Sequence, residues 1–178
     1  MIYVLLTDGF EEVEALTPID IMRRAGLDVK TVSISDDLYV KGSHNIIVKA
    51  DINVAEVNLN DMEMLVLPGG PGHTMLDADK NVHTFIDYAA ENDIYIAAIC
   101  ASPSIIGKKG LLAGKKATAF PGFEKYLTDA EVLADKVVVD GKFITGKGAG
   151  ASAEFGFSLV TLLLNKEIAD NLKETMQY

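Results

Sequence analysis

The chain contains four short apolar runs, and segments with helical periodicity lie between them. The runs are Ile2–Leu6, Val29–Ile34, Met64–Leu67 and Tyr95–Ile99. Continuous apolar runs of this length are typical of strands that are buried on both faces of a sheet. Their alternation with helical segments predicts an α/β fold, with a mainly parallel sheet and helices on both faces.

The helical segments carry their apolar residues on one stripe. The clearest is Lys80–Asn92, whose apolar positions recur at helical spacing: Val82, Phe85, Ile86, Ala89 and Ala90. A second helix is predicted over Glu11–Arg24, with Gly26 as its stop. We expect Pro18 to kink or restart this helix, because its ring removes one backbone hydrogen bond.

Two later segments predict hairpins. Val40–Val48 contains a turn signal between short apolar stretches, which indicates a small hairpin or side strand. Lys136–Thr145 gives a stronger prediction, because Asp140-Gly141 separates two β-branched runs and suits a type I′ turn.

Two further helices close the chain. Ser152 is a good N-cap for a helix that runs to Leu164 and is apolar nearly all round. The terminal helix repeats apolar residues at a spacing of four: Ile168, Leu172 and Met176. With no repeat or linker between these segments, residues 1–178 are expected to form a single domain.

Composition narrows the classes of function. The chain has 178 residues, a formal net charge of −10 and one cysteine. The negative charge argues against nucleic acid as a general electrostatic partner. No apolar run approaches the ~20 residues that span a bilayer, and the opening residues predict a first strand rather than a signal peptide. A lone cysteine forms no intrachain disulfide, which favours a cytoplasmic location.

The one cysteine follows the fourth apolar run directly. Cys100 stands between Tyr95–Ile99 and small residues that lead into a short helix ending near Gly110. A sharp strand-to-helix turn is where a nucleophile elbow places its reactive residue. The unpaired N–H groups of the following helix favour an anion, so we expect a lowered thiol pKa. On position alone, a small buried hydrophobic cysteine fits equally well.

Two more loops follow strands at the same edge of the predicted sheet. Asp8–Glu14 holds three glutamates, which suit a helix N-terminus but would repel the phosphates of a flavin or dinucleotide. Glu14 is placed to turn inward towards the sheet. Leu67–His73 carries the pair Gly69-Gly70, which suits an oxyanion hole but also suits a plain tight turn.

In combination, these motifs resemble the DJ-1 branch of the ThiJ/PfpI superfamily. The resemblance runs almost end to end, through Glu11–Glu14, Pro18–Gly26, Leu67–Gly70, Ala97–Ala101 and Gly148–Phe155. It implies a flavodoxin-like three-layer α/β sandwich with a nucleophile elbow, usually assembled as a homodimer. By motif match, Cys100 is the reactive cysteine and Glu14 its carboxyl partner. The amides of Gly69, Gly70 and Ala101 would hold an oxyanion.

The resemblance also implies a class of reaction. Such a protein acts without a cofactor as a glyoxalase III or deglycase, on methylglyoxal, glyoxal or their early adducts. The alternative is a sensor or protective protein in oxidative stress, in which Cys100 is oxidised to a sulfinate. A general hydrolase or amidotransferase ranks third, because an amidotransferase requires a Cys-His-Glu triad.

Several positions depart from the pattern of the family. Phe120-Pro121 replaces a histidine-proline pair, so a Cys-His dyad is missing, and Ala101 replaces the histidine of the peptidase-like branch. A peptidase is therefore not expected. His44 stands where relatives have an arginine, and His44 and Arg24 are candidate contacts for an anion or substrate.

The remaining histidines give no sign of a metal site. His73 and His83 have no metal-ligand spacing with each other or with Cys100. We therefore expect neither a metal nor another cofactor.

Overall fold

A seven-stranded sheet organises the protein, which a computed structural model describes over all 178 residues. Its strand order is β10-β11-β7-β6-β1-β2-β5. The strands are β1 (Ile2–Leu6), β2 (Val29–Ser33), β5 (Ile52–Asn53), β6 (Met64–Leu67), β7 (Tyr95–Ile99), β10 (Val137–Asp140) and β11 (Phe143–Gly146). All neighbours pair in parallel except β10 and β11. The prediction of a mainly parallel sheet is confirmed.

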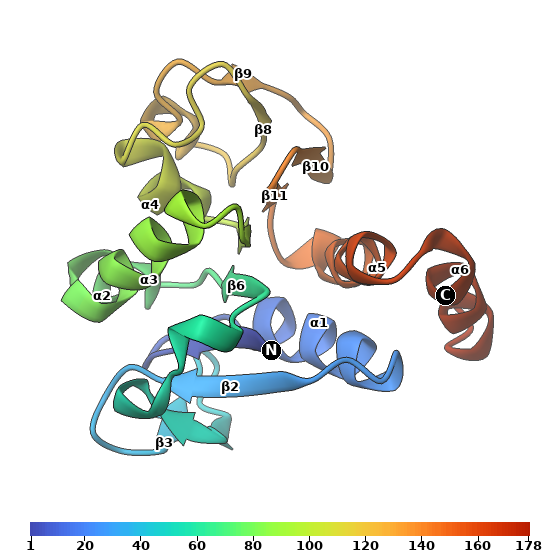
Figure 1. Cartoon of the computed structure of the whole chain (residues 1–178), viewed down its shortest axis with the longest axis horizontal. Helices are drawn as coiled ribbons and strands as arrows, with labels where there is room; N and C mark the ends of the chain where they lie inside the picture. The colour runs from blue at the N-terminus through green and yellow to red at the C-terminus, as the bar shows by residue number, and fades with distance from the viewer.

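Helices cover both faces of this sheet (Figure 1). On one face lie α1 (Glu12–Arg24), α5 (Ser152–Leu163) and α6 (Lys166–Thr175). On the other lie α2 (His73–Ala78), α3 (Lys80–Glu91) and α4 (Pro103–Lys108). The three layers are those of the predicted flavodoxin-like sandwich. None of these helices is long and apolar enough to cross a membrane.

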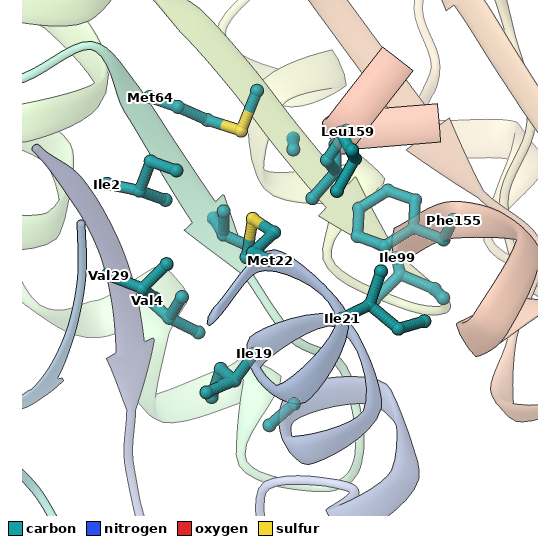
Figure 2. Close-up of a cluster of buried hydrophobic side chains, with 14 of the residues drawn as sticks. Ile2, Val4, Ile19, Ile21, Met22, Val29, Met64, Ile99, Phe155 and Leu159 are labelled. Carbon is teal, nitrogen blue, oxygen red and sulfur yellow. The ribbon is translucent and has the colours of Figure 1, made fainter. Parts of the chain in front are cut away.

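The alternation of side chains along the strands divides the core in two. In β1, Ile2 and Val4 join the cluster beneath α1 and α5, whereas Tyr3 and Leu5 join the cluster beneath α3. Figure 2 shows the first cluster, in which Phe155 of α5 packs beside Ile99 at the end of β7. The strand that precedes Cys100 is thus buried on both faces, which fixes the position of the cysteine.

Smaller elements lie outside the seven-stranded sheet. The predicted hairpin is formed by β3 (Tyr39–Lys41) and β4 (Ile47–Lys49), which make a separate antiparallel sheet. A third sheet pairs β8 (Lys116–Ala117) with β9 (Glu131–Val132). Four 3-10 turns complete the chain: Val54–Glu56, Leu59–Asp61, Glu124–Tyr126 and Ala149–Ala151. The apolar pattern does not predict α2, β5, β8 or β9.

The expected restart at Pro18 does not occur, because α1 runs without a break from Glu12 to Arg24. Packing against α5 offsets the lost hydrogen bond. Gly156 of α5 sits so close that an added Cβ would lie 3.0 Å from the Pro18 Cα and 2.9 Å from Ile21 Cδ1. Close contact between the two helices holds α1 together at its proline.

Two local predictions also need correction. The hairpin turn has Gly141 and Lys142 at its centre, and only Gly141 has a positive φ, of 60°. That is the pattern of a type II′ turn rather than type I′. Ser152 is the first residue of α5 and not its cap; its hydroxyl donates to the Ala149 carbonyl at 2.8 Å.

Candidate active site

Cys100 occupies a strained turn between β7 and α4. Its φ is +66°, a left-handed conformation that non-glycine residues rarely adopt and that costs on the order of 1–3 kcal/mol. Hydrogen bonds hold the turn on both sides: the Cys100 N–H donates to the Gly146 carbonyl, and the Phe120 N–H donates to the Cys100 carbonyl, both at 2.8 Å. The predicted nucleophile elbow is confirmed.

Glu14 reaches the sulfur from the first turn of α1. Its side chain is only 1% exposed, and its carboxyl group is hydrogen-bonded to the Cys100 thiol. The Gly69 N–H donates to Glu14 Oε2 at 3.1 Å. The predicted partners Cys100, Glu14 and Gly69 are thus brought together.

The glycine loop fits this arrangement only because Gly69 has no side chain. A Cβ at Gly69 would lie 2.5 Å from both the Cys100 Cβ and Glu14 Oε2. A buried hydrogen bond from the Ser102 hydroxyl to the Pro68 carbonyl, at 2.5 Å, ties the elbow to the same loop. Of the three amides expected to hold an oxyanion, those of Gly70 and Ala101 bond to Cys100 and lower its pKa, whereas the Gly69 N–H is already used by Glu14.

Burial and mutual repulsion raise the pKa values of both reactive groups. Burial raises the pKa of Glu14 to about 7. Burial and the charge of the neighbouring Glu14 raise the pKa of Cys100 to about 12. The two groups therefore titrate as a pair, which carries a single negative charge over most of the range between these values.

The expectation of a lowered thiol pKa is wrong beside a charged Glu14. The Gly70 and Ala101 amides do lower the pKa of Cys100, but burial and the Glu14 carboxylate outweigh them. The helix that begins at Pro103 has only six residues. The position of this helix can be predicted from the sequence. The burial of the Cys100 sulfur and the contact between the sulfur and Glu14 depend on the fold.

A pocket of about 350 Å³ opens over the sulfur. Its lining residues come from α1, from the start of α2, from one 3-10 turn and from the connections between strands and helices: Glu11, Glu14, Gly70, Pro71, His73, Cys100, Ala101, Phe120, Phe123 and Ala149. Phe120 therefore does stand in the site, where it offers an apolar wall and no proton acceptor. The pocket is large enough for a small carbonyl compound to reach the sulfur.

His73 also lines this pocket, a position that the sequence does not predict. Its Nδ1 lies 2.9 Å from the Gly70 carbonyl, which can only accept a hydrogen bond, so Nδ1 carries the proton. In the neutral ring Nε2 is then a free acceptor. Edge contact with Phe123, at 5.1 Å between ring centroids, fixes the ring. The place of His73 in the sequence, directly after the glycine loop, is the feature that indicates a position near the site.

His44 does not line the pocket, contrary to its expected role as a contact for an anion. Its Nδ1 lies 2.9 Å from Glu12 Oε2 and 3.6 Å from Glu11 Oε1, and its side chain is 69% exposed. The hydrogen bond to Glu12 and the charge of Glu11 raise the pKa of His44. His44 instead anchors the β3–β4 hairpin to the start of α1.

Glu12 is the buried centre of this anchor. Its carboxylate accepts hydrogen bonds from the His44 N–H at 2.8 Å and from the Ser43 hydroxyl at 3.1 Å. Burial alone would raise the pKa of Glu12, but hydrogen bonds from His44 and Ser43 lower it to about 2. Glu11, Glu12 and His44 place three possible metal ligands within 4.8 Å of one another. Their oxygens already serve the hairpin, so we assign this cluster a structural role.

Arg24 and His83 also lie outside the pocket. Arg24, at the end of α1, pairs with Asp20 at 2.8 Å and is half exposed. His83 Nε2 lies 2.7 Å from the Asp77 carbonyl. Within one chain, neither residue contributes to the site around Cys100.

Known proteins share this fold and this sequence. The model of the DJ-1/PfpI family matches residues 1–162. Protein DJ-1 homolog B of Arabidopsis thaliana is 38% identical over 169 residues, which cover 93% of this chain and 38% of that protein. Protein DJ-1 homolog A of the same plant has 46% of its length covered, so the chain spans less than half of either plant protein.

Other relatives are similar in size to this chain. Protein dj-1beta of Drosophila melanogaster is 32% identical, with 92% of this chain and 89% of that protein covered. The structure of oxidized Toxoplasma gondii DJ-1 superposes with a TM-score of 0.94 at 31% identity, covering 99% of this chain and 97% of that one. A cysteine-to-alanine mutant of a DJ-1 superfamily protein from Salmonella typhimurium gives a TM-score of 0.93, also at 31% identity and with the same coverage. With its elbow cysteine and flavodoxin-like sandwich, this chain belongs to the DJ-1/PfpI family.

Proposed function

We propose that this protein is a cysteine-dependent enzyme that converts methylglyoxal, glyoxal or their early adducts without a cofactor, as a glyoxalase III or deglycase. The observation that carries the proposal is the Glu14–Cys100 pair, which shares a hydrogen bond beneath an open pocket of about 350 Å³. We place it in the cytoplasm, where a lone thiol remains reduced.

In the proposed reaction, the sulfur adds to the aldehyde carbon while Glu14 accepts the thiol proton. The carbonyl oxygen gains a proton and a hemithioacetal forms. A proton then moves from the first carbon to the second while the hydroxyl proton passes from the first oxygen to the second, which converts the hemithioacetal into a lactoyl thioester. Water hydrolyses the thioester, lactate leaves and the thiol is restored. Overall, methylglyoxal and water give lactate, with no net oxidation.

Glu14 suits the first step because a general base works best when its pKa lies near the working pH. A carboxyl group with a pKa of about 7 is available in both forms at neutral pH. His73 offers a second proton acceptor in the same pocket, since its Nδ1–H is held by Gly70. We assign His73 the transfer of protons at the substrate oxygen, because the Phe120 ring has no group that can carry a proton.

The test is conversion of methylglyoxal by the purified protein, followed as lactate released. Wild type should form lactate, and Cys100→Ser should form none above the uncatalysed rate. The control is Ser104→Ala, which changes another buried side chain on the helix after the elbow. Equal activity in wild type and Cys100→Ser, including none in either, would refute the proposal.

Oxidation of Cys100 is a second candidate function. Cys100 is partly exposed and its sulfur receives N–H donors from Gly70 and Ala101, which would also bind the oxygens of a sulfinate. Among the similar structures, that of the Toxoplasma protein is of an oxidized form. After mild peroxide, intact mass should show two added oxygens in wild type and none in Cys100→Ser. An unchanged mass in wild type would exclude this role.

We further propose a homodimer built on the hairpin and α1. Large apolar side chains are exposed there: Val13, Tyr39, Ile46 and Ile47. Hydrophobic side chains gathered in this way often mark an interface. Sedimentation should give twice the chain mass for wild type and the single-chain mass for Ile47→Glu. A single-chain mass for wild type would contradict the proposal.

A further inference from the structure

A second cleft adjoins the pocket over Cys100. Its volume is about 390 Å³, and its lining residues are Phe120, Pro121, Lys136, Lys147 and the segment from Gly148 to Ala151. Phe120 and Ala149 line both hollows. Gly148 lies at the boundary: a Cβ there would be 3.2 Å from the Phe120 ring and 4.0 Å from Glu14 Oε1. A molecule in this cleft would therefore lie beside the reactive pair.

Strand register explains why two lysines meet at this cleft. Gly146 of β11 pairs with Ile99 of β7, so Lys147 follows its strand where Cys100 follows its own. Lys136 and Lys147 lie opposite each other at the end of the β10–β11 ladder, joined by the Lys147 N–H and the Lys136 carbonyl at 2.9 Å.

The charges of this pair are only partly balanced. Like charges directly opposite on neighbouring strands destabilise a hairpin unless an anion lies between them. Lys136 Nζ is 3.9 Å from Glu154 Oε2, whereas Lys147 Nζ donates to the neutral Ala134 carbonyl at 3.2 Å. Lys136, Lys147 and Glu154 together carry a net charge of +1, in addition to the single negative charge of the Glu14–Cys100 pair in the adjoining pocket, in a chain whose own net charge is −10.

We infer that the cleft binds the carboxylate of a carbonyl substrate whose aldehyde or ketone group reaches Cys100. One net positive charge matches one carboxylate better than it matches a dianion. The ammonium group of Lys147 makes the main contact, and the exposed apolar ring of Phe120 supports the chain between the two ends. The inference rests on the proposed function for its reacting group, and it extends the substrate class from methylglyoxal and glyoxal, which carry no carboxylate, to carbonyl compounds that bear one.

Thiol labelling tests this inference without requiring turnover. The probes are three methanethiosulfonates with a neutral methyl, an anionic 2-sulfonatoethyl or a cationic 2-(trimethylammonio)ethyl group. In each reaction the Cys100 sulfur forms a disulfide with the probe, and methanesulfinate leaves. The rates are compared in wild type, Lys147→Gln and Lys80→Gln. The last variant removes an equal charge from an exposed position that does not line the cleft.

In Lys147→Gln, the anionic-to-neutral rate ratio should fall roughly 3- to 10-fold, as expected for one charge a few ångströms away, and the cationic-to-neutral ratio should rise. The fall should shrink at high salt. An unchanged ratio, or the same fall in Lys80→Gln, would overturn the inference. If the charge preference holds but methylglyoxal is not converted, the proposed function fails and the subsite stands.

Discussion

Replacing Glu14 by glutamine should stabilise the protein at alkaline pH while it destroys activity. A glutamate in the unfolded chain has a pKa near 4.5, and burial raises that of Glu14 to about 7 in the fold. The folded state therefore binds more protons than the unfolded state between these values, so wild-type stability falls as the pH rises through this range. The pKa difference corresponds to roughly 3 kcal/mol, fully lost above pH 7.

Glutamine has nearly the same shape but no proton to lose, so Glu14→Gln should escape this loss. Urea unfolding from pH 4.5 to 8.5 measures the difference directly. The free energy of unfolding of Glu14→Gln relative to wild type should rise by about 2–3 kcal/mol between pH 4.5 and pH 8. Lactate formation should fall roughly 100-fold or more, because the proton acceptor is lost.

Glu91→Gln is the matched control, since it removes an exposed carboxylate at the end of α3. Its stability should follow that of wild type at every pH. If the profiles of Glu14→Gln and wild type are parallel from pH 4.5 to 8.5, Glu14 has no raised pKa in the fold. The account of the Glu14–Cys100 pair would then be wrong.

Three further outcomes are expected. Gly69→Ala should destabilise the fold by about 1–3 kcal/mol in thermal unfolding, because its Cβ would meet Cys100 and Glu14 at 2.5 Å. Gly150→Ala, with open space around the added Cβ, should cost much less, and equal losses would contradict the packing argument. His73→Gln should lower lactate formation roughly 100-fold, because proton transfer at the substrate oxygen is lost, and should leave labelling of Cys100 by a neutral reagent unchanged. Slower labelling would show that His73 acts on the sulfur instead. Thiolate absorbance of wild type should stay below one equivalent up to pH 9 and should rise at lower pH in Glu14→Gln; a complete thiolate signal at pH 6 would refute the raised thiol pKa.

Apolar pattern predicted the fold well because each buried strand needs a run of apolar residues. β1, β6 and β7 begin and end at the predicted residues, and α3 differs by one residue. Two-residue strands such as β5 and β8 were missed, since so few positions carry no periodicity. The continuity of α1 through Pro18 could not be predicted either, because it depends on contact with Gly156, far away in the chain.

The candidate site was predictable where a motif combines local geometry with a special residue. Cys100 and Gly69 are such positions, since the turn after a buried strand fixes their backbone. His44 and His73 show the limit. The sequence predicts that His44 contacts a ligand and assigns no role to His73. In the structure, His44 contacts Glu12 and His73 lines the pocket. A side chain's direction depends on partners that are distant in the sequence.

The proton shared by Glu14 and Cys100 also bears on the choice between catalysis and sensing. A sensor needs a thiolate at rest, because peroxide reacts with the thiolate and not with the thiol. Beside a charged Glu14 the pKa of Cys100 is about 12, so the sulfur holds its proton until that proton can pass to the carboxylate. An aldehyde bound in the pocket drives this transfer by forming a bond to the sulfur, and Gly70 and Ala101 stabilise the charge as it moves. We expect a thiol that is activated in this way to react faster with a bound carbonyl than with peroxide in solution, and we therefore rank the proposed enzyme above the proposed sensor.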